Sequence, residues 1–161
     1  RIALWGGGLG GALQWNCATG PLLGRLRAVV FQQATISYES VIRDHKFKSH
    51  LLEAYGMPED VPDDLAVAAL SFNDPVTRTK LLLEEMGEDL ARLLPEVLFI
   101  HGDKDEAMLY DGNPVRLSNV LNACGAAHSI HTFQGVGHAT YALGETAAGV
   151  LAGFFKKVFG L

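Results

Sequence analysis

The sequence has little of several features that mark specialised proteins. Its 161 residues include only two cysteines, Cys17 and Cys124, and their separation matches no metal-binding pattern. We therefore expect two reduced, buried thiols, as in an intracellular protein, and place the chain in the cytoplasm. No window approaches the roughly 20 uninterrupted apolar residues that a membrane-spanning helix needs, so we expect no membrane insertion.

An excess of charge of one sign is also missing. Thirteen basic and 18 acidic residues are interspersed and give a net charge of −5. This balance argues against a nucleic acid or an anionic membrane surface as a partner. The chain is instead rich in apolar residues, at 48%, with 19% charged, which is typical of a globular domain with one core.

The chain lacks an initiator methionine as well. It opens with Arg1 and runs at once into an apolar, strand-like stretch at residues 2–5 that leads to a cluster of glycines. Natural domains seldom begin at such a turn, so we expect a fragment, a processed product or one piece of a larger assembly. A tight turn between a strand and a helix lies at the carboxyl end of the sheet, where α/β proteins have their catalytic and binding residues.

Strand-like and helix-like stretches alternate along the rest of the chain. We expect strands at 2–5, 27–32, 96–102 and 129–133, and helices at 9–18, 38–55, 63–70, 75–94, 113–123 and 145–159. This alternation predicts a single α/β domain at 1–161, with a parallel sheet and helices on both faces. Asp74 and Pro75 mark the start of one helix, and Gly87 a possible break in it. We interpret the all-helical stretch at 35–95 as an inserted lid.

Two motifs fit the glycine-rich turn. Gly6, Gly8 and Gly11 match G-x-G-x-x-G, the dinucleotide-binding pattern. Gly6, Gly8 and Gly10 also match the frame of G-x-S-x-G, the nucleophile elbow, with Gly8 in the place of serine. A dinucleotide site calls for an acidic residue at the end of the second strand, but residues 31–33 read Phe-Gln-Gln. Binding of FAD or NAD is therefore the weaker alternative, and we expect no cofactor.

Two later segments favour the second motif. Residues 97–105, VLFIHGDKD, resemble the strand and turn that carry the catalytic acid in the α/β-hydrolase superfamily, with Asp105 at the acid position. Residues 133–138, FQGVGH, resemble the final loop of that family, with His138 at the base position. Elbow, acid and base follow one another in the family's order. The resemblance extends over essentially the whole chain, which corresponds to the C-terminal half of that fold. The family's earlier strands, and the loop that gives one oxyanion-hole amide, have no counterpart in the sequence.

This resemblance implies hydrolysis of an ester, lactone or thioester in a small apolar substrate, through a nucleophile, Asp105 and His138. It places the nucleophile at Gly8 and an oxyanion-hole donor at the backbone amide of Leu9. Glycine has no side chain to attack a carbonyl, so we expect the chain to be inactive or impaired. Three explanations stay open: a serine replaced to trap substrate, a non-catalytic relative that binds a small ligand, or attack by a water that His138 activates.

Plainer interpretations of the same residues also stay open. The glycine turn fits close packing of a helix on a sheet. Asp105 fits an ordinary turn residue, with Asp103 as its rival for the acid, and His138 fits a loop cap.

A further expectation concerns the first strand. If the preceding strands are missing, the edge of this strand exposes unpaired backbone N–H and C=O groups, which invite pairing with another chain. We therefore expect a second chain, either the N-terminal half of the fold or a second copy in a homodimer.

Overall fold

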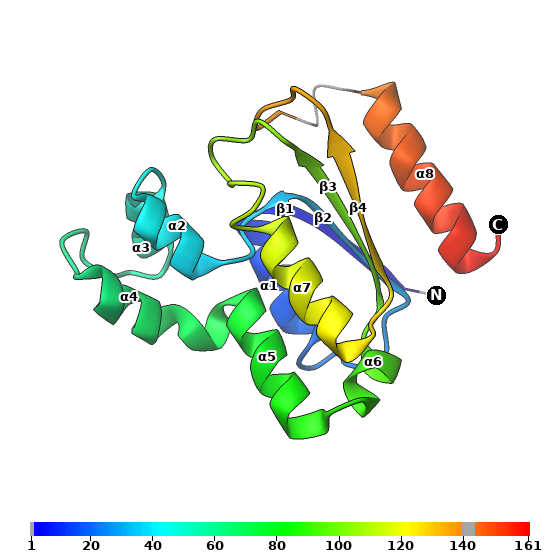
Figure 1. Ribbon diagram of the computed structural model, residues 1–161, viewed down its shortest axis with the longest axis horizontal. Coiled ribbons are helices and arrows are strands. Elements are labelled where there is room, and N and C mark those ends of the chain that lie inside the picture. The colour runs from blue at the N-terminus through cyan, green and yellow to red at the C-terminus, as the bar shows by residue number, and fades with distance from the viewer. Residues whose placement is uncertain (1, 140–143) are drawn as a thin grey trace.

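A four-stranded parallel sheet lies at the centre of the molecule (Figure 1). The computed structural model describes residues 2–139 and 144–161. The strands stand side by side in chain order: β1 (Ala3–Gly8), β2 (Ala28–Ala34), β3 (Glu96–Gly102) and β4 (His128–Phe133). Parallel neighbours need crossover connections, and here helices supply them. The prediction of an α/β fold with a parallel sheet is confirmed.

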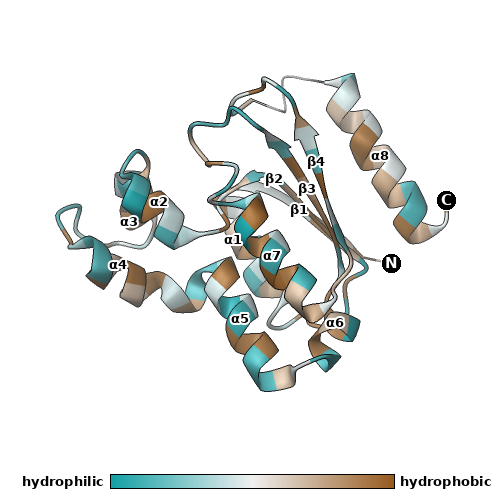
Figure 2. Cartoon of the chain, in the orientation of Figure 1, coloured by the Kyte–Doolittle hydropathy of each residue, from teal (hydrophilic) through white to brown (hydrophobic). Residues whose placement is uncertain are grey.

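Alternate residues of the strands face two separate apolar layers. On one face, Phe154 and Val158 of α8 (Glu145–Phe159) pack with Val30 and Ile100. Because β2 and β3 are buried on both faces, their sequences are nearly continuous apolar runs, and β3 is largely brown in Figure 2.

The opposite face of the sheet carries the larger core. Phe31 and Phe99 stack there with ring centroids 5.1 Å apart, and Trp15 packs against Phe31. Four helices cover this face: α1 (Leu9–Ala18), α5 (Pro75–Met86), α6 (Asp89–Leu93) and α7 (Pro114–Cys124). Helices therefore cover both faces, as predicted.

The helical stretch between β2 and β3 falls into two groups. Three helices project beside the sheet and share a second core, which also contains Ala12 of α1 and Met108: α2 (Tyr38–Asp44), α3 (Lys48–Ala54) and α4 (Asp63–Leu70). The other two, α5 and α6, pack in the layer that also holds α1 and α7. A role of the stretch at 35–95 as a lid stays a prediction.

Local signals set the start and end of α5. The side chain of Asp74 accepts a hydrogen bond from the backbone N–H of Thr77 at 2.7 Å, and Pro75 takes the first helical position, as predicted. Gly87, with φ 57°, ends the helix and separates it from α6.

One expectation about the cysteines is wrong. Cys124 is buried in α7, but Cys17 is exposed. The buried residues of α1 form a single stripe, Gly11, Ala12, Gln14, Trp15 and Ala18, and Cys17 lies off that stripe. Only that stripe faces the sheet, so the thiol of Cys17 meets solvent.

Among the described residues, no helix is both long enough and apolar enough to cross a membrane. No cluster of three or more His, Cys, Asp or Glu side chains among them is placed to hold a metal ion.

Candidate active site

The turn between β1 and α1 is a sharp strand-to-helix elbow. Gly8 ends β1 and caps α1 with φ 50° and ψ −136°, a conformation that residues with side chains rarely adopt. A Cβ placed on Gly8 would nevertheless meet no atom within 4 Å. The backbone at this position favours glycine, whereas the space around it would accept a side chain.

The neighbouring glycines Gly6 and Gly11 allow α1 to pack closely against the sheet. A Cβ on Gly6 would lie 2.8 Å from the carbonyl oxygen of Gly10, and one on Gly11 would lie 2.3 Å from the Cβ of Ala34. These contacts bring α1 close to β1 and β2. Packing therefore accounts for Gly6 and Gly11, both of which the dinucleotide pattern requires.

The carboxylate of Asp105 is fully buried in the turn after β3. Its Oδ1 accepts hydrogen bonds from the backbone N–H groups of Ala107, at 2.9 Å, and Met108, at 2.8 Å. Asp103, the rival acid, instead accepts a hydrogen bond from the backbone N–H of Gly135 at 2.6 Å. Asp103 thus ties the β3 turn to the loop after β4.

His138 lies against Asp105. Its Nδ1 is 2.9 Å from Oδ2 and 3.1 Å from Oδ1 of that carboxylate. An ionised carboxylate only accepts hydrogen bonds, so Nδ1 carries the proton and Nε2 is the acceptor in the neutral ring. The side chain of His138 is 42% exposed. The structure therefore brings Asp105, and not Asp103, to the histidine.

One cavity joins the elbow to the histidine. It has a volume of about 360 Å³, and its lining residues are Trp5, Gly6, Gly7, Gly8, Gln32, Gln33 and His138. Leu9 begins α1 directly after Gly8, so its backbone N–H belongs to the first helical turn, where N–H groups lack a partner within the helix. The predicted nucleophile position and base position thus share one space.

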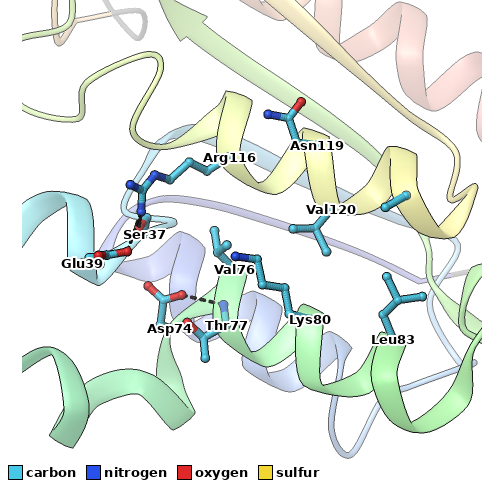
Figure 3. A pocket seen from close by; sticks show the side chains of 11 residues that line it. Ser37, Glu39, Asp74, Val76, Thr77, Lys80, Leu83, Arg116, Asn119 and Val120 are labelled. Atoms are coloured by element: carbon cyan, nitrogen blue, oxygen red, sulfur yellow. Dashed lines mark hydrogen bonds and ion pairs between the residues drawn. The ribbon is translucent and has the colours of Figure 1, made fainter.

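A larger cavity of about 500 Å³ lies elsewhere, between α5 and α7 (Figure 3). Arg116, which lines this cavity, forms an ion pair with Glu39 at 2.8 Å. Asp74, which also lines it, caps α5. None of the site residues predicted from the sequence lines this cavity.

Two polar residues near the acid were missed by the sequence reasoning. Gln33 is buried and donates hydrogen bonds from Nε2 to Asp105 Oδ2, at 3.3 Å, and to the carbonyl of Gly137, at 2.7 Å. His101 lies with Nε2 3.3 Å from Asp105 Oδ2 and 2.6 Å from the carbonyl of Met108, and burial lowers the pKa of His101. Both residues could have been proposed from the sequence, because each is a polar residue near the carboxyl end of a parallel strand.

Comparisons with known proteins identify the fold. No family model and no curated protein matches the sequence. Three similar structures are a puromycin-hydrolyzing peptidase of Mycobacterium tuberculosis (20% identity, TM-score 0.64), an acylaminoacyl peptidase (15%, 0.74) and an S-formylglutathione hydrolase of Agrobacterium tumefaciens (17%, 0.65). The matches cover 86%, 97% and 98% of this chain and 19%, 23% and 50% of theirs.

The acylaminoacyl peptidase and the S-formylglutathione hydrolase are members of the α/β-hydrolase superfamily. The chain has the α/β-hydrolase fold, as the resemblance of its motifs predicted, and it spans half or less of the length of these three structures. Identities of this size show the fold alone.

Proposed function

We propose that this chain holds the acid and base of an acyl hydrolase, with Gly8 at the position of the nucleophile. The observation that carries the proposal is the shared cavity of Gly8 and His138, with Asp105 behind the histidine. Further support comes from the structural neighbours, which are named as peptidases, esterases and other hydrolases.

The proposed chemistry follows from the protonation of His138. Asp105 accepts a hydrogen bond from the Nδ1–H of His138, so the unprotonated Nε2 acts as the base. In an ancestor with serine at position 8, Nε2 takes the hydroxyl proton while Oγ attacks the acyl carbon. The backbone N–H of Leu9 stabilises the oxyanion, and His138 returns the proton to the leaving group. Water then releases the acyl group by the same steps.

In the present sequence the attacking atom is missing. Gly8 forms no acyl-enzyme, so turnover by this route is absent, and a water activated by His138 supports at most a far slower reaction. A second candidate is a non-catalytic relative that binds a small ligand. The cavity favours it, because the space above Gly8 is open and Trp5 lies in its wall.

Restoring the side chain tests the proposal. We expect Gly8→Ser to gain hydrolysis of short p-nitrophenyl esters, because the open space at Gly8 accepts the hydroxymethyl group. The positive φ should make this variant less stable by about 1–3 kcal/mol, which thermal unfolding measures. Adding His138→Ala should abolish the gain. A folded Gly8→Ser variant that hydrolyses esters no faster than the parent chain supports the binding candidate instead.

A further inference from the structure

The end of β2 contains an irregularity beside the proposed site. Gly7 pairs with Gln32, but Gly8 pairs with Ala34, so Gln33 is an extra residue in the register between β1 and β2. Its φ is 46°, and it is one of two non-glycine residues with positive φ in the described part of the chain. Bulges of this kind redirect a side chain and recur next to active sites.

The redirected side chain connects two parts of the site. The Nε2 group of Gln33 donates to Asp105 Oδ2 and to the carbonyl of Gly137, the residue before His138. Both partners are acceptors, so the amide must present its NH₂ group, and not its oxygen, to them. One buried amide therefore links the acid to the loop that carries the base.

We infer that Gln33 is a positioning residue that holds Asp105 and His138 in register, a role whose catalytic meaning rests on the proposed function. Asp105 Oδ1 accepts hydrogen bonds from Ala107 and Met108 within its own turn and lies 3.1 Å from His138 Nδ1, whereas Oδ2 faces His138 and Gln33. The imidazole is 42% exposed, so hydrogen bonds hold it more than packing does. Loss of the amide removes the hydrogen bond to the carbonyl of Gly137 and loosens the pair.

A matched pair of variants in the parent chain tests this role without any need for catalysis. Gln33→Met keeps the length of the side chain and removes the amide. Gln14→Met does the same at another buried glutamine, whose Nε2 donates to the carbonyl of Val30 at 2.7 Å, outside the site. The measurement is the low-field proton signal of His138 Nδ1–H in NMR spectra, assigned by its loss in His138→Gln.

We expect Gln33→Met to broaden or lose this signal through exchange with water, and Gln14→Met to retain it. A signal that is unchanged in folded Gln33→Met overturns the inference. If Gln33→Met does not fold, Gln33→Asn replaces it, because asparagine accepts positive φ more readily but is too short to reach both acceptors. The same loss of signal is expected there, and a retained signal again overturns the inference.

Kinetics in the Gly8→Ser background give the second measurement. There we expect Gln33→Met to lower kcat about tenfold with KM little changed, since a misplaced base weakens proton transfer and not binding. If Gly8→Ser is inert but the NMR signal depends on Gln33, positioning stands and the proposed function fails. If Gly8→Ser is active and neither signal nor kcat depends on Gln33, the inference alone fails.

Discussion

At the scale of single residues, donors from three segments of the chain converge on the carboxylate of Asp105. Its own turn supplies two backbone N–H groups, β2 supplies Gln33, and the loop after β4 supplies His138. These hydrogen bonds satisfy the buried oxygens of the carboxylate and set its orientation toward His138.

His101 gives this cluster a pH-dependent stability. Burial lowers the pKa of His101 below its ordinary value of 6.5, so the folded chain keeps the ring neutral where the unfolded chain begins to take up a proton. This contribution to the free energy of unfolding is fully present above pH 6.5 and is lost as the pH falls toward the lowered pKa.

His101→Gln should therefore flatten this dependence, because glutamine retains a donor for the carbonyl of Met108 and does not titrate. Urea unfolding at about pH 7.5 and about pH 5.5 measures the difference. We expect the parent chain to lose more stability than the variant between these two values. Equal losses would show that His101 does not titrate as described.

At the scale of elements, much of the fold could be predicted from the sequence. Helices α1 and α8 and strand β3 have the predicted bounds, because glycines, turns and polar residues stand directly at their ends. The predicted helix at 38–55 divides into α2 and α3, since His45 ends α2 in the left-handed conformation, which no simple sequence signal marks.

Strand β1 shows why other parts of the site were less predictable. It runs to Gly8 and not to Trp5, because pairing with β2 overrides the weak strand preference of three successive glycines. Strand β2 likewise continues past Gln32 to Ala34. The bulge at Gln33 is a property of two paired strands, so no pattern within either strand predicts it. Gly8, Asp105 and His138 could be proposed as site residues from the sequence because each stands in a local motif after a strand.

The packing of α1 against β2 makes a prediction about two neighbouring glycines. A Cβ on Gly11 would lie 2.3 Å from Ala34 Cβ, whereas one on Gly10 would meet nothing within 4 Å. We expect Gly11→Ala to lower the free energy of unfolding by about 1–3 kcal/mol through overpacking. Gly10→Ala should be neutral or stabilising by about 0.5–1 kcal/mol, because alanine favours the helix. Equal effects in denaturant titrations would contradict the close helix–strand contact.

At the scale of the whole molecule, β1 is an edge strand next to exposed apolar side chains. In the described residues it pairs with β2 alone, and Ile2 and Trp5 are 54% and 59% exposed. An open edge of this kind pairs readily with another chain. We propose that β1 is the contact for a second chain, either a separate N-terminal half or a second copy.

For the chain alone, this proposal predicts self-association in size-exclusion chromatography with light scattering. Ile2→Lys should shift the population toward monomer, because a charge at the edge opposes strand pairing. Leu65→Lys, a control on α4 with similar exposure, should not. A well-folded parent chain with the 17.3 kDa mass of a monomer would contradict the proposal.

The central claim, that Gly8 occupies the nucleophile position of a site with a working base, is tested most directly by covalent labelling. The measurement is intact-mass spectrometry of Gly8→Ser after treatment with a fluorophosphonate, which reacts with a serine only where a base activates it. We predict one adduct on Ser at position 8, lost when His138→Ala is added, and none on the Gly10→Ser control. No adduct on folded Gly8→Ser, or equal labelling of Gly10→Ser, would contradict the account.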